Sequence, residues 1–393
     1  MFKKIMVLKM IITPLASISC SQKEENITIW NSWLPDEFKK EGMQFVTNFN
    51  NKINNLIKID SELKDIGKIN FEFKSNNNDV IYQNIISNKE NCDFAIVPYR
   101  VFKNLNLDEI DFQIAMQTAT KSFSWAYDDE SIYGQKSFSN ITNSYNEKLN
   151  LSDSFENWGN NYGYKNGIYS DFYKTGTSST YRGQIIISGD KDTLNSIKTA
   201  WNNKDLKKFI NYGIIFKSKK SSGAYKLQRS LLSKHFNVDI NEIENKLDSI
   251  NDEIVLLKNP GEFIGKSTEE TGLKKIYHIA FTDHGVFNWT KSKNKLFTPK
   301  KGDKLEILSV TNPAPYSVMI ARKGLNPKLV NLIKKVFAEL KTEENVYGNF
   351  TGYAKFYQIN LNTFKALLNN YNYSENNIGS YQSPKELLKN GNN

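Results

Sequence analysis

Ser221, Ser222 and Gly223 lie between a short apolar strand-like run and a stretch with helical spacing. Free N–H groups at the start of a helix, together with the positive end of the helix dipole, bind phosphate. The Ser hydroxyls add hydrogen-bond donors, and Gly lets an oxyanion approach the backbone. These residues predict an anion-binding turn, although simple capping of the helix by Ser222 explains the same pattern at least as well.

Cys20 is a second residue whose surroundings indicate chemistry, here acylation of the thiol. Three lysines precede an uncharged run over residues 10–19, and the chain then turns polar. A positive start, a short apolar core and small residues before a cut make a secretory signal peptide. The sequence Ser19–Cys20 resembles a bacterial lipobox, although Ser17 stands where Leu is usual, and a buried strand with an incidental Cys is the alternative. We therefore expect a signal peptide over residues 1–19 and a lipid on Cys20.

The expected lipid makes the protein membrane-anchored rather than membrane-spanning. The apolar run is roughly half of the ~20 residues that a transmembrane helix needs. Two or more acyl chains together give stable attachment to a bilayer. A diacylglycerol on Cys20 would hold the chain on the outer, extracytoplasmic face of the cell membrane.

The remaining chain alternates between strand-like and helix-like segments. Residues 69–74 alternate as a strand and residues 184–188 form an apolar strand, whereas residues 192–203 and 327–340 have helical spacing. Strands that alternate with helices favour an α/β architecture with largely parallel sheets. Residues 128–180 are too long for an ordinary connection, and such segments are commonly functional.

Composition limits the classes of protein and partner. The chain has 393 residues and 39% hydrophobic residues, enough for two domains with cores of their own. The formal net charge of +10 at pH 7 suits an anionic membrane surface or an anionic ligand. The lysines are scattered rather than gathered, so we expect no nucleic-acid partner. Once Cys20 is lipidated, only Cys92 remains for thiol chemistry, which excludes an intramolecular disulfide.

An exported, lipid-anchored, two-domain α/β protein has the profile of a solute receptor for an ABC importer. Three segments, at residues 180–236, 278–290 and 310–318, resemble the mycoplasma high-affinity transport lipoproteins that bind thiamine and its phosphates. The Ser-Ile-Ser-Cys-Ser end of the signal resembles them too, and the likeness runs in order over most of the chain. The strand, Ser-Ser-Gly turn and helix are also similar to receptors for phosphonates and phosphate esters.

The resemblance implies a two-lobed, periplasmic-binding-protein-like fold of type II with the ligand cleft between the lobes. We expect lobe 1 to contain residues 20–120 and 310–393, and lobe 2 to contain residues 181–309. Residues 121–180 are expected as an aromatic-rich insertion along the rim of the cleft. The resemblance also implies an ABC transporter permease as partner and a monomeric receptor.

The ligand implied by the resemblance is thiamine diphosphate or a related thiamine compound. It needs an anion cradle, for which Ser221, Ser222, Gly223 and the bidentate donor Arg182 are the candidates. A surface salt bridge is the alternative for Arg182. Asp283 suits the aminopyrimidine or the thiazolium, or else caps a turn. Aromatic faces attract the cationic ring, and the candidates, about half of which we expect to be core residues, are Trp33, Trp125, Trp158, Tyr181, Tyr225, Trp289 and Tyr316.

The sequence leaves several alternatives open. The sequence does not distinguish thiamine from its mono- or diphosphate, and it does not decide whether Ca²⁺ or Mg²⁺ accompanies the diphosphate. A surface adhesin is an alternative binding function, served by the aromatic residues of 128–180 and the basic charge. A secreted hydrolase, such as a nuclease or a polysaccharide lyase, is a weaker alternative, since the chain contains no G-x-S-x-G, HExxH or P-loop motif. We therefore expect a binding protein rather than an enzyme.

Overall fold

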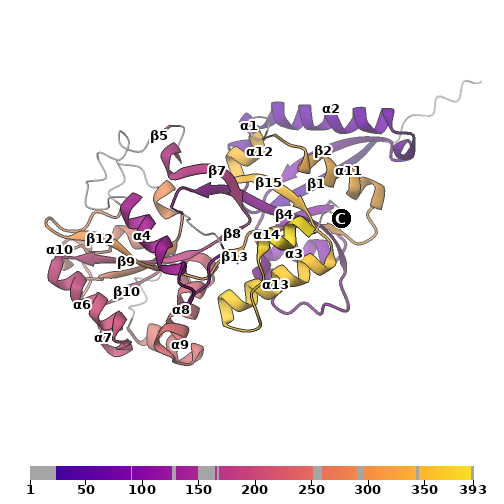
Figure 1. Ribbon diagram of the computed structural model, residues 1–393. Coiled ribbons are helices and arrows are strands. Elements are labelled where there is room, and N and C mark those ends of the chain that lie inside the picture. Colours follow the sequence, from indigo (N-terminus) through magenta and orange to yellow (C-terminus); the bar gives the residue numbers. More distant parts are fainter. Residues whose placement is uncertain are drawn as a thin grey trace, which may run out of the picture.

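The chain forms two α/β lobes, each built around its own sheet, in the computed structural model (Figure 1). The structure describes residues 24–89, 91–125, 130–148, 164–165, 168–250, 259–289, 296–341 and 345–390. The expected signal peptide, Cys20 and Trp158 lie outside these ranges. Among the helices within these ranges, none has both the length and the apolar character needed to cross a membrane.

Lobe 1 is built on a seven-stranded mixed sheet with the order β15-β4-β14-β3-β1-β2, to which β7 adds by pairing with β4. The first three strands in the chain are parallel, whereas β14 is antiparallel to both of its neighbours. The strands are β1 (Glu24–Asn31), β2 (Lys68–Lys74), β3 (Phe94–Val97), β4 (Phe112–Phe123), β7 (Tyr173–Ser178), β14 (Val318–Arg322) and β15 (Tyr353–Gln358).

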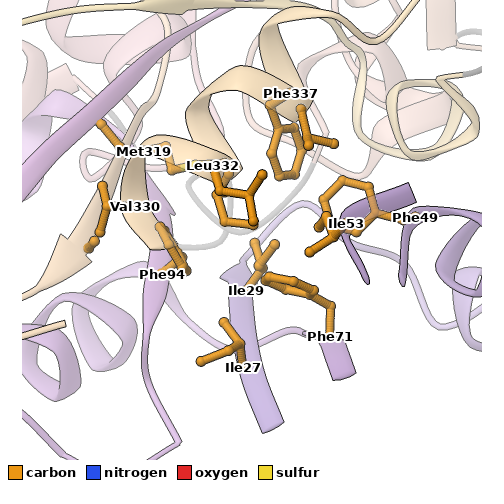
Figure 2. Close-up of a cluster of buried hydrophobic side chains, with 14 of the residues drawn as sticks. Ile27, Ile29, Phe49, Ile53, Phe71, Phe94, Met319, Val330, Leu332 and Phe337 are labelled. Carbon is orange, nitrogen blue, oxygen red and sulfur yellow. The ribbon is translucent and has the colours of Figure 1, made fainter. Parts of the chain in front are cut away.

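Helices cover both faces of this sheet. The buried residues Phe45, Phe49, Ile53 and Ile57 of α2 are four apart and so share one helix face, which packs on β1 and β2 with α11 beside it (Figure 2). The opposite face is covered by α3 and α13. The helices of this lobe are α1 (Phe38–Glu41), α2 (Met43–Ile59), α3 (Asn78–Ile86), α11 (Pro327–Ala338), α12 (Val346–Thr351), α13 (Leu361–Asn376) and α14 (Pro384–Asn390).

Lobe 2 is built on a four-stranded sheet with the order β10-β11-β9-β12. Alternate side chains of β9 face opposite ways: Ile185 and Ile187 pack with α6 to α9, and Ile186 packs with α4. The elements are α4 (Phe138–Lys148), β9 (Gly183–Gly189), α6 (Lys191–Asn202), α7 (Leu206–Asn211), β10 (Ile214–Ile215), α8 (Leu227–Phe236), α9 (Ile240–Ile250), α10 (Thr268–Thr271), β11 (Ile279–Asp283) and β12 (Lys304–Val310).

Two short strands join the lobes. β8 (Thr180–Tyr181) leads from β7 of lobe 1 into β9 of lobe 2, and β13 (Ala314–Pro315) leads from β12 back to β14. They pair with each other as an antiparallel two-stranded sheet. The chain therefore crosses between the lobes on paired strands, which is the arrangement of a hinge.

The α/β class and the two lobes agree with the expectation from the sequence, but the sheets are less parallel than expected. Within lobe 2, β9 is antiparallel to both β11 and β12. The reason is the crossing, because β9 runs away from the hinge and β12 runs back toward it. The same return path makes β14 antiparallel in lobe 1.

The described parts of residues 121–180 do more than line a rim. The buried side chains of Phe138, Ile141 and Tyr145 on α4 form part of the lobe 2 core, where α4 packs against β12. β7 extends the sheet of lobe 1. This segment also contains the short strand pair β5 (Tyr164–Lys165) and β6 (Ile168–Tyr169).

Candidate functional site

The Ser-Ser-Gly turn begins a helix, as the sequence predicts. Ser221 is the N-cap residue, and its hydroxyl accepts a hydrogen bond of 3.2 Å from the N–H of Ala224. A π-helical turn, η5 (Ser222–Lys226), follows and continues directly into α8. The first N–H groups of a helix have no acceptor within it, so the N–H groups of the buried residues Ser222 and Gly223 need an acceptor from outside the helix.

Gly223 lies in close contact with the end of β11. A Cβ atom added to Gly223 would lie 1.9 Å from Oδ1 of Asp283 and 3.3 Å from the ring of Tyr181. Such distances leave no room for a larger side chain. Glycine at this position therefore lets the backbone of the turn, the carboxylate and the aromatic ring meet.

Asp283, the last residue of β11, is exposed beside Gly223 and Tyr181, and we call the surface formed by these three residues the recess. The residue is solvent-exposed, yet desolvation by the surrounding protein raises the pKa of its carboxyl from 3.8 to about 6, against smaller opposite effects of a backbone hydrogen bond and of Lys217. Exposure together with strong desolvation is expected for a group in a concave site. A cation that enters this recess would meet a carboxylate that has lost part of its hydration.

Two tyrosines from the hinge form an aromatic wall beside the turn. The rings of Tyr181 and Tyr316 lie with centroids 5.2 Å apart at an interplanar angle of 44°. The N–H of Tyr316 donates to the carbonyl oxygen of Ser179 at 2.9 Å, which fixes the residue at the end of β13. Burial raises the pKa of Tyr181, and the charge of Glu375 raises it further. The hydroxyl of Tyr181 therefore stays neutral at physiological pH.

Arg182 is placed differently from these residues, although it directly follows Tyr181. It is 3% exposed, and its guanidinium donates to the carbonyl oxygens of Thr311 and Ser131 at 2.7 Å each. Neither the predicted phosphate contact nor the alternative of a surface salt bridge matches this arrangement. The geometry favours a structural role for Arg182, in which it ties residues 130–148 to the strand that returns to the hinge.

The other predicted aromatic contacts separate into core and surface residues. Trp125 and Tyr225 are fully buried in the lobe 2 core, and Nε1 of Trp125 donates to Nε2 of His284 at 2.8 Å. Trp33 is 61% exposed just beyond the end of β1. Trp289 ends a 3₁₀ turn, η8 (Val286–Trp289), but its side chain, like all of Trp158, is not among the residues described. The sequence expectation that part of this set is core is met by Trp125 and Tyr225.

Two residues of α13 reach the turn from the other lobe, and sequence reasoning missed both. The hydroxyl of Ser222 lies 2.9 Å from that of Tyr371 and donates to Oε2 of Glu375 at 3.3 Å. Nζ of Lys226 donates to Oε1 of Glu375 at 2.8 Å. The i, i+4 spacing of Tyr371 and Glu375 puts them on one helix face, but nothing in the sequence indicates that this face meets a turn about 150 residues earlier.

A divalent cation finds no evident ligand set in the described part of the chain. Within it, no three His, Cys, Asp or Glu side chains are gathered so that they would hold a metal ion.

Comparison with known families identifies the class of protein that this fold and recess define. Residues 43–372 match the family of extracytoplasmic thiamine-binding lipoproteins. The match covers most of both lobes, and the chain belongs to this family.

Individual relatives carry the name p37. The chain is 38% identical over 182 residues to the high affinity transport system protein p37 of Mesomycoplasma hyorhinis, a match that covers 46% of this chain and 43% of that protein. It is 32% identical over 191 residues to the protein of the same name from Mycoplasma pneumoniae, with 44% and 48% covered. These matches thus span less than half of the length of either relative.

A solved structure extends the likeness over the whole fold. Mh-p37 of Mycoplasma hyorhinis, a proposed thiamine pyrophosphate transporter, is 27% identical with a TM-score of 0.74. The superposition covers 88% of this chain and 100% of that one. The two-lobed binding-protein fold predicted from the sequence is thereby confirmed.

Proposed function

We propose that this protein is the solute receptor of an ABC importer and that it binds thiamine diphosphate or a closely related thiamine compound. The observation that carries the proposal is the convergence of an exposed carboxylate, an aromatic wall and a helix start at the hinge. Asp283, Tyr181 and Gly223 come from three separate segments, and the first two surround the position that a Cβ atom on Gly223 would occupy. Membership in the thiamine-binding family supports the choice of ligand.

The chemistry of the recess suits a ligand with a cationic ring and an anionic tail. The faces of Tyr181 and Tyr316 attract a thiazolium by about 0.5–2 kcal/mol, depending on desolvation. The carboxylate of Asp283 adds an ionic partner for the ring or a hydrogen-bond acceptor for the aminopyrimidine. The helix start at Ser222 and Gly223 stabilises a phosphate by about 0.3–1 kcal/mol when exposed and up to about 2 kcal/mol when partly buried.

The remaining parts of the proposal concern place and partners. A lipid on Cys20 would anchor the receptor at the outer face of the cell membrane, and a permease would receive the solute. Closure of the two lobes on paired hinge strands would enclose the ligand. We propose a monomer and no catalytic cofactor.

Calorimetric titration with thiamine and with thiamine diphosphate tests the proposal. We expect at least one of them to bind the wild-type protein, and Asp283→Ala to weaken binding of both by at least tenfold, because both have the cationic ring. Asp192→Ala is the matched control, since Asp192 lies in the first turn of α6 in the same lobe and is exposed. Failure of every thiamine compound to bind or to raise the melting temperature would contradict the proposal.

A further inference from the structure

We infer that Glu375 is a specificity-determining residue, which competes with the phosphate tail of a ligand for the donors of the Ser-Ser-Gly turn. The inference rests on the proposed function, because it places the tail at this turn. Glu375 belongs to α13 of lobe 1, whereas Ser222 and Lys226 belong to lobe 2. A carboxylate of one lobe thus occupies donors of the other.

The surroundings of Glu375 are those of a bound anion. Its side chain is almost fully buried, with the residue 2% exposed. It accepts from Nζ of Lys226 at 2.8 Å and from the Ser222 hydroxyl at 3.3 Å, and Tyr371 donates to it as well. An ammonium group and two hydroxyls are donors that a phosphate oxygen would also use.

Contacts on either side keep α13 in place against α8. The hydroxyl of Ser230 donates to Oδ1 of Asn377 at 2.7 Å, and Nζ of Lys234 lies 3.7 Å from the centre of the Tyr373 ring. Leu227 at the start of α8 packs in the same apolar cluster as Tyr371. Because both helices are held together over these contacts, the carboxylate of Glu375 cannot easily move away from the turn.

The charge balance at the turn follows from this arrangement. Asp283 lies on one side of Gly223, and Glu375 lies against Ser222. Lys226 is paired with Glu375, and Arg182 donates to backbone carbonyl groups. A diphosphate tail must therefore compete with Glu375 for Lys226 and Ser222 and is repelled by its charge, whereas unphosphorylated thiamine does neither. Glu375 thus shifts the preference of the receptor toward the less phosphorylated ligand.

Replacement of Glu375 by Gln tests this role, with inorganic pyrophosphate as a probe that needs no thiamine ring. Glu375→Gln keeps the size of the side chain and removes its charge. We expect the affinities for pyrophosphate and thiamine diphosphate to rise at least about tenfold in calorimetry, and that for thiamine to change less than about twofold. Glu244→Gln is the control, since Glu244 pairs with Arg229 of α8 but lies on α9.

The outcomes separate this inference from the proposed function. Equal pyrophosphate affinities of the wild type and Glu375→Gln, or no pyrophosphate binding by either, would overturn the role of Glu375. Failure of the wild type to bind any thiamine compound would instead overturn the proposed function, and the pyrophosphate affinities of the two proteins could still be compared. If Glu375→Gln does not fold, Glu375→Asp withdraws the carboxylate by one methylene and should raise pyrophosphate affinity about threefold; no gain would contradict the inference.

Discussion

The ends of β9 and β11 present two different chemistries on two sides of the same strand pair. Asp283 pairs with Gly183 in the antiparallel register, and the N–H of His284 donates to the carbonyl oxygen of Arg182 at 3.0 Å. Tyr181 and Asp283 lie beside Gly223 of the Ser-Ser-Gly turn. Arg182 and His284 are instead buried, with 3% and 5% of each residue exposed. Adjacent residues thus lie either beside the turn or in the core, because successive side chains point to opposite faces.

On the buried face, Arg182 and His284 each have hydrogen-bond partners within the protein. Burial, and next to it the charge of Arg182, lower the pKa of His284 to about 3, so its ring is neutral and Nε2 accepts from Trp125. The charge of Arg182 is met by carbonyl oxygens. On the recess face, by contrast, Asp283 keeps its exposure to solvent. A polar residue whose hydrogen-bonding groups are paired within the protein stabilises the fold. A polar residue that is exposed at the surface is instead available to a ligand.

Replacement of Arg182 should have the largest effect on stability. Arg182→Ala removes two charge-assisted hydrogen bonds of about 1.5–3 kcal/mol each, so we expect the free energy of unfolding to fall by about 3–6 kcal/mol in urea denaturation. Arg100→Ala is the control, because Arg100 pairs with an exposed Asp79, and such surface pairs contribute about 0–1 kcal/mol.

The ligand affinities of Arg182→Ala also test whether Arg182 has a structural role or belongs to the phosphate site. A structural Arg182 lowers the affinity for thiamine and for its diphosphate alike, in proportion to the loss of folded protein. A selective loss of diphosphate binding with unchanged stability would instead assign Arg182 to the phosphate site, as expected from the sequence.

Replacement of Gly223, which lies against Asp283, should have the next largest effect on stability. Gly223→Ala brings a methyl group into the space of Oδ1 of Asp283, and such overpacking costs about 1–3 kcal/mol. Ligand affinity should also fall, because the carboxylate must turn away. In the double variant with Asp283→Ala the methyl group gains room, so we expect at least about 1 kcal/mol of stability to return relative to additivity. Strict additivity in denaturation would show that the two residues are not in contact.

Much of the architecture could be predicted from the sequence because its signals are local. The apolar spacing of α6 and α11 and the strand pattern of β9 each predict an element that the structure contains. The sequence is a poorer guide to whether neighbouring strands are parallel or antiparallel, because these directions depend on where the chain crosses the hinge. The segment over 121–180 looked like an insertion because α4 contributes only a few apolar side chains, Phe138, Ile141 and Tyr145, to a core that other segments mostly build.

The site was predictable only where its residues are neighbours in the chain. The Ser-Ser-Gly turn is visible as a motif, and Asp283 as the end of a strand. Arg182 was expected in the recess because the sequence does not fix which face of the strand pair it occupies. Glu375 gave no signal, since its contact with Ser222 depends on the packing of α13 against α8 across two lobes.

The pH dependence of stability should reveal the raised pKa of Asp283. Because the folded-state pKa of Asp283 is raised from 3.8 to about 6, the folded protein keeps a proton that the unfolded chain releases. The stability contributed by protonated Asp283 is therefore fully present below about pH 4 and is lost as the pH rises through about 6. Asp283→Asn should remove this part of the pH dependence of the melting temperature between pH 4 and 6. An unchanged profile would mean that the carboxyl is well hydrated.

Removal of the N-cap at the turn should have the smallest effect on stability and the most selective effect on binding. Ser221→Ala removes the acceptor for the N–H of Ala224, and loss of such a cap costs about 1 kcal/mol. Ser267→Ala is the matched control, since Ser267 caps the exposed helix α10 of the same lobe through a capping box. Both variants should therefore lose similar small amounts of stability. Only Ser221→Ala should weaken binding of thiamine diphosphate, by a few-fold, because it loosens the N–H groups that we propose as phosphate donors. Equal diphosphate affinities of the two variants in calorimetry would move the phosphate away from the helix start and leave the recess face with Asp283 and the tyrosines alone.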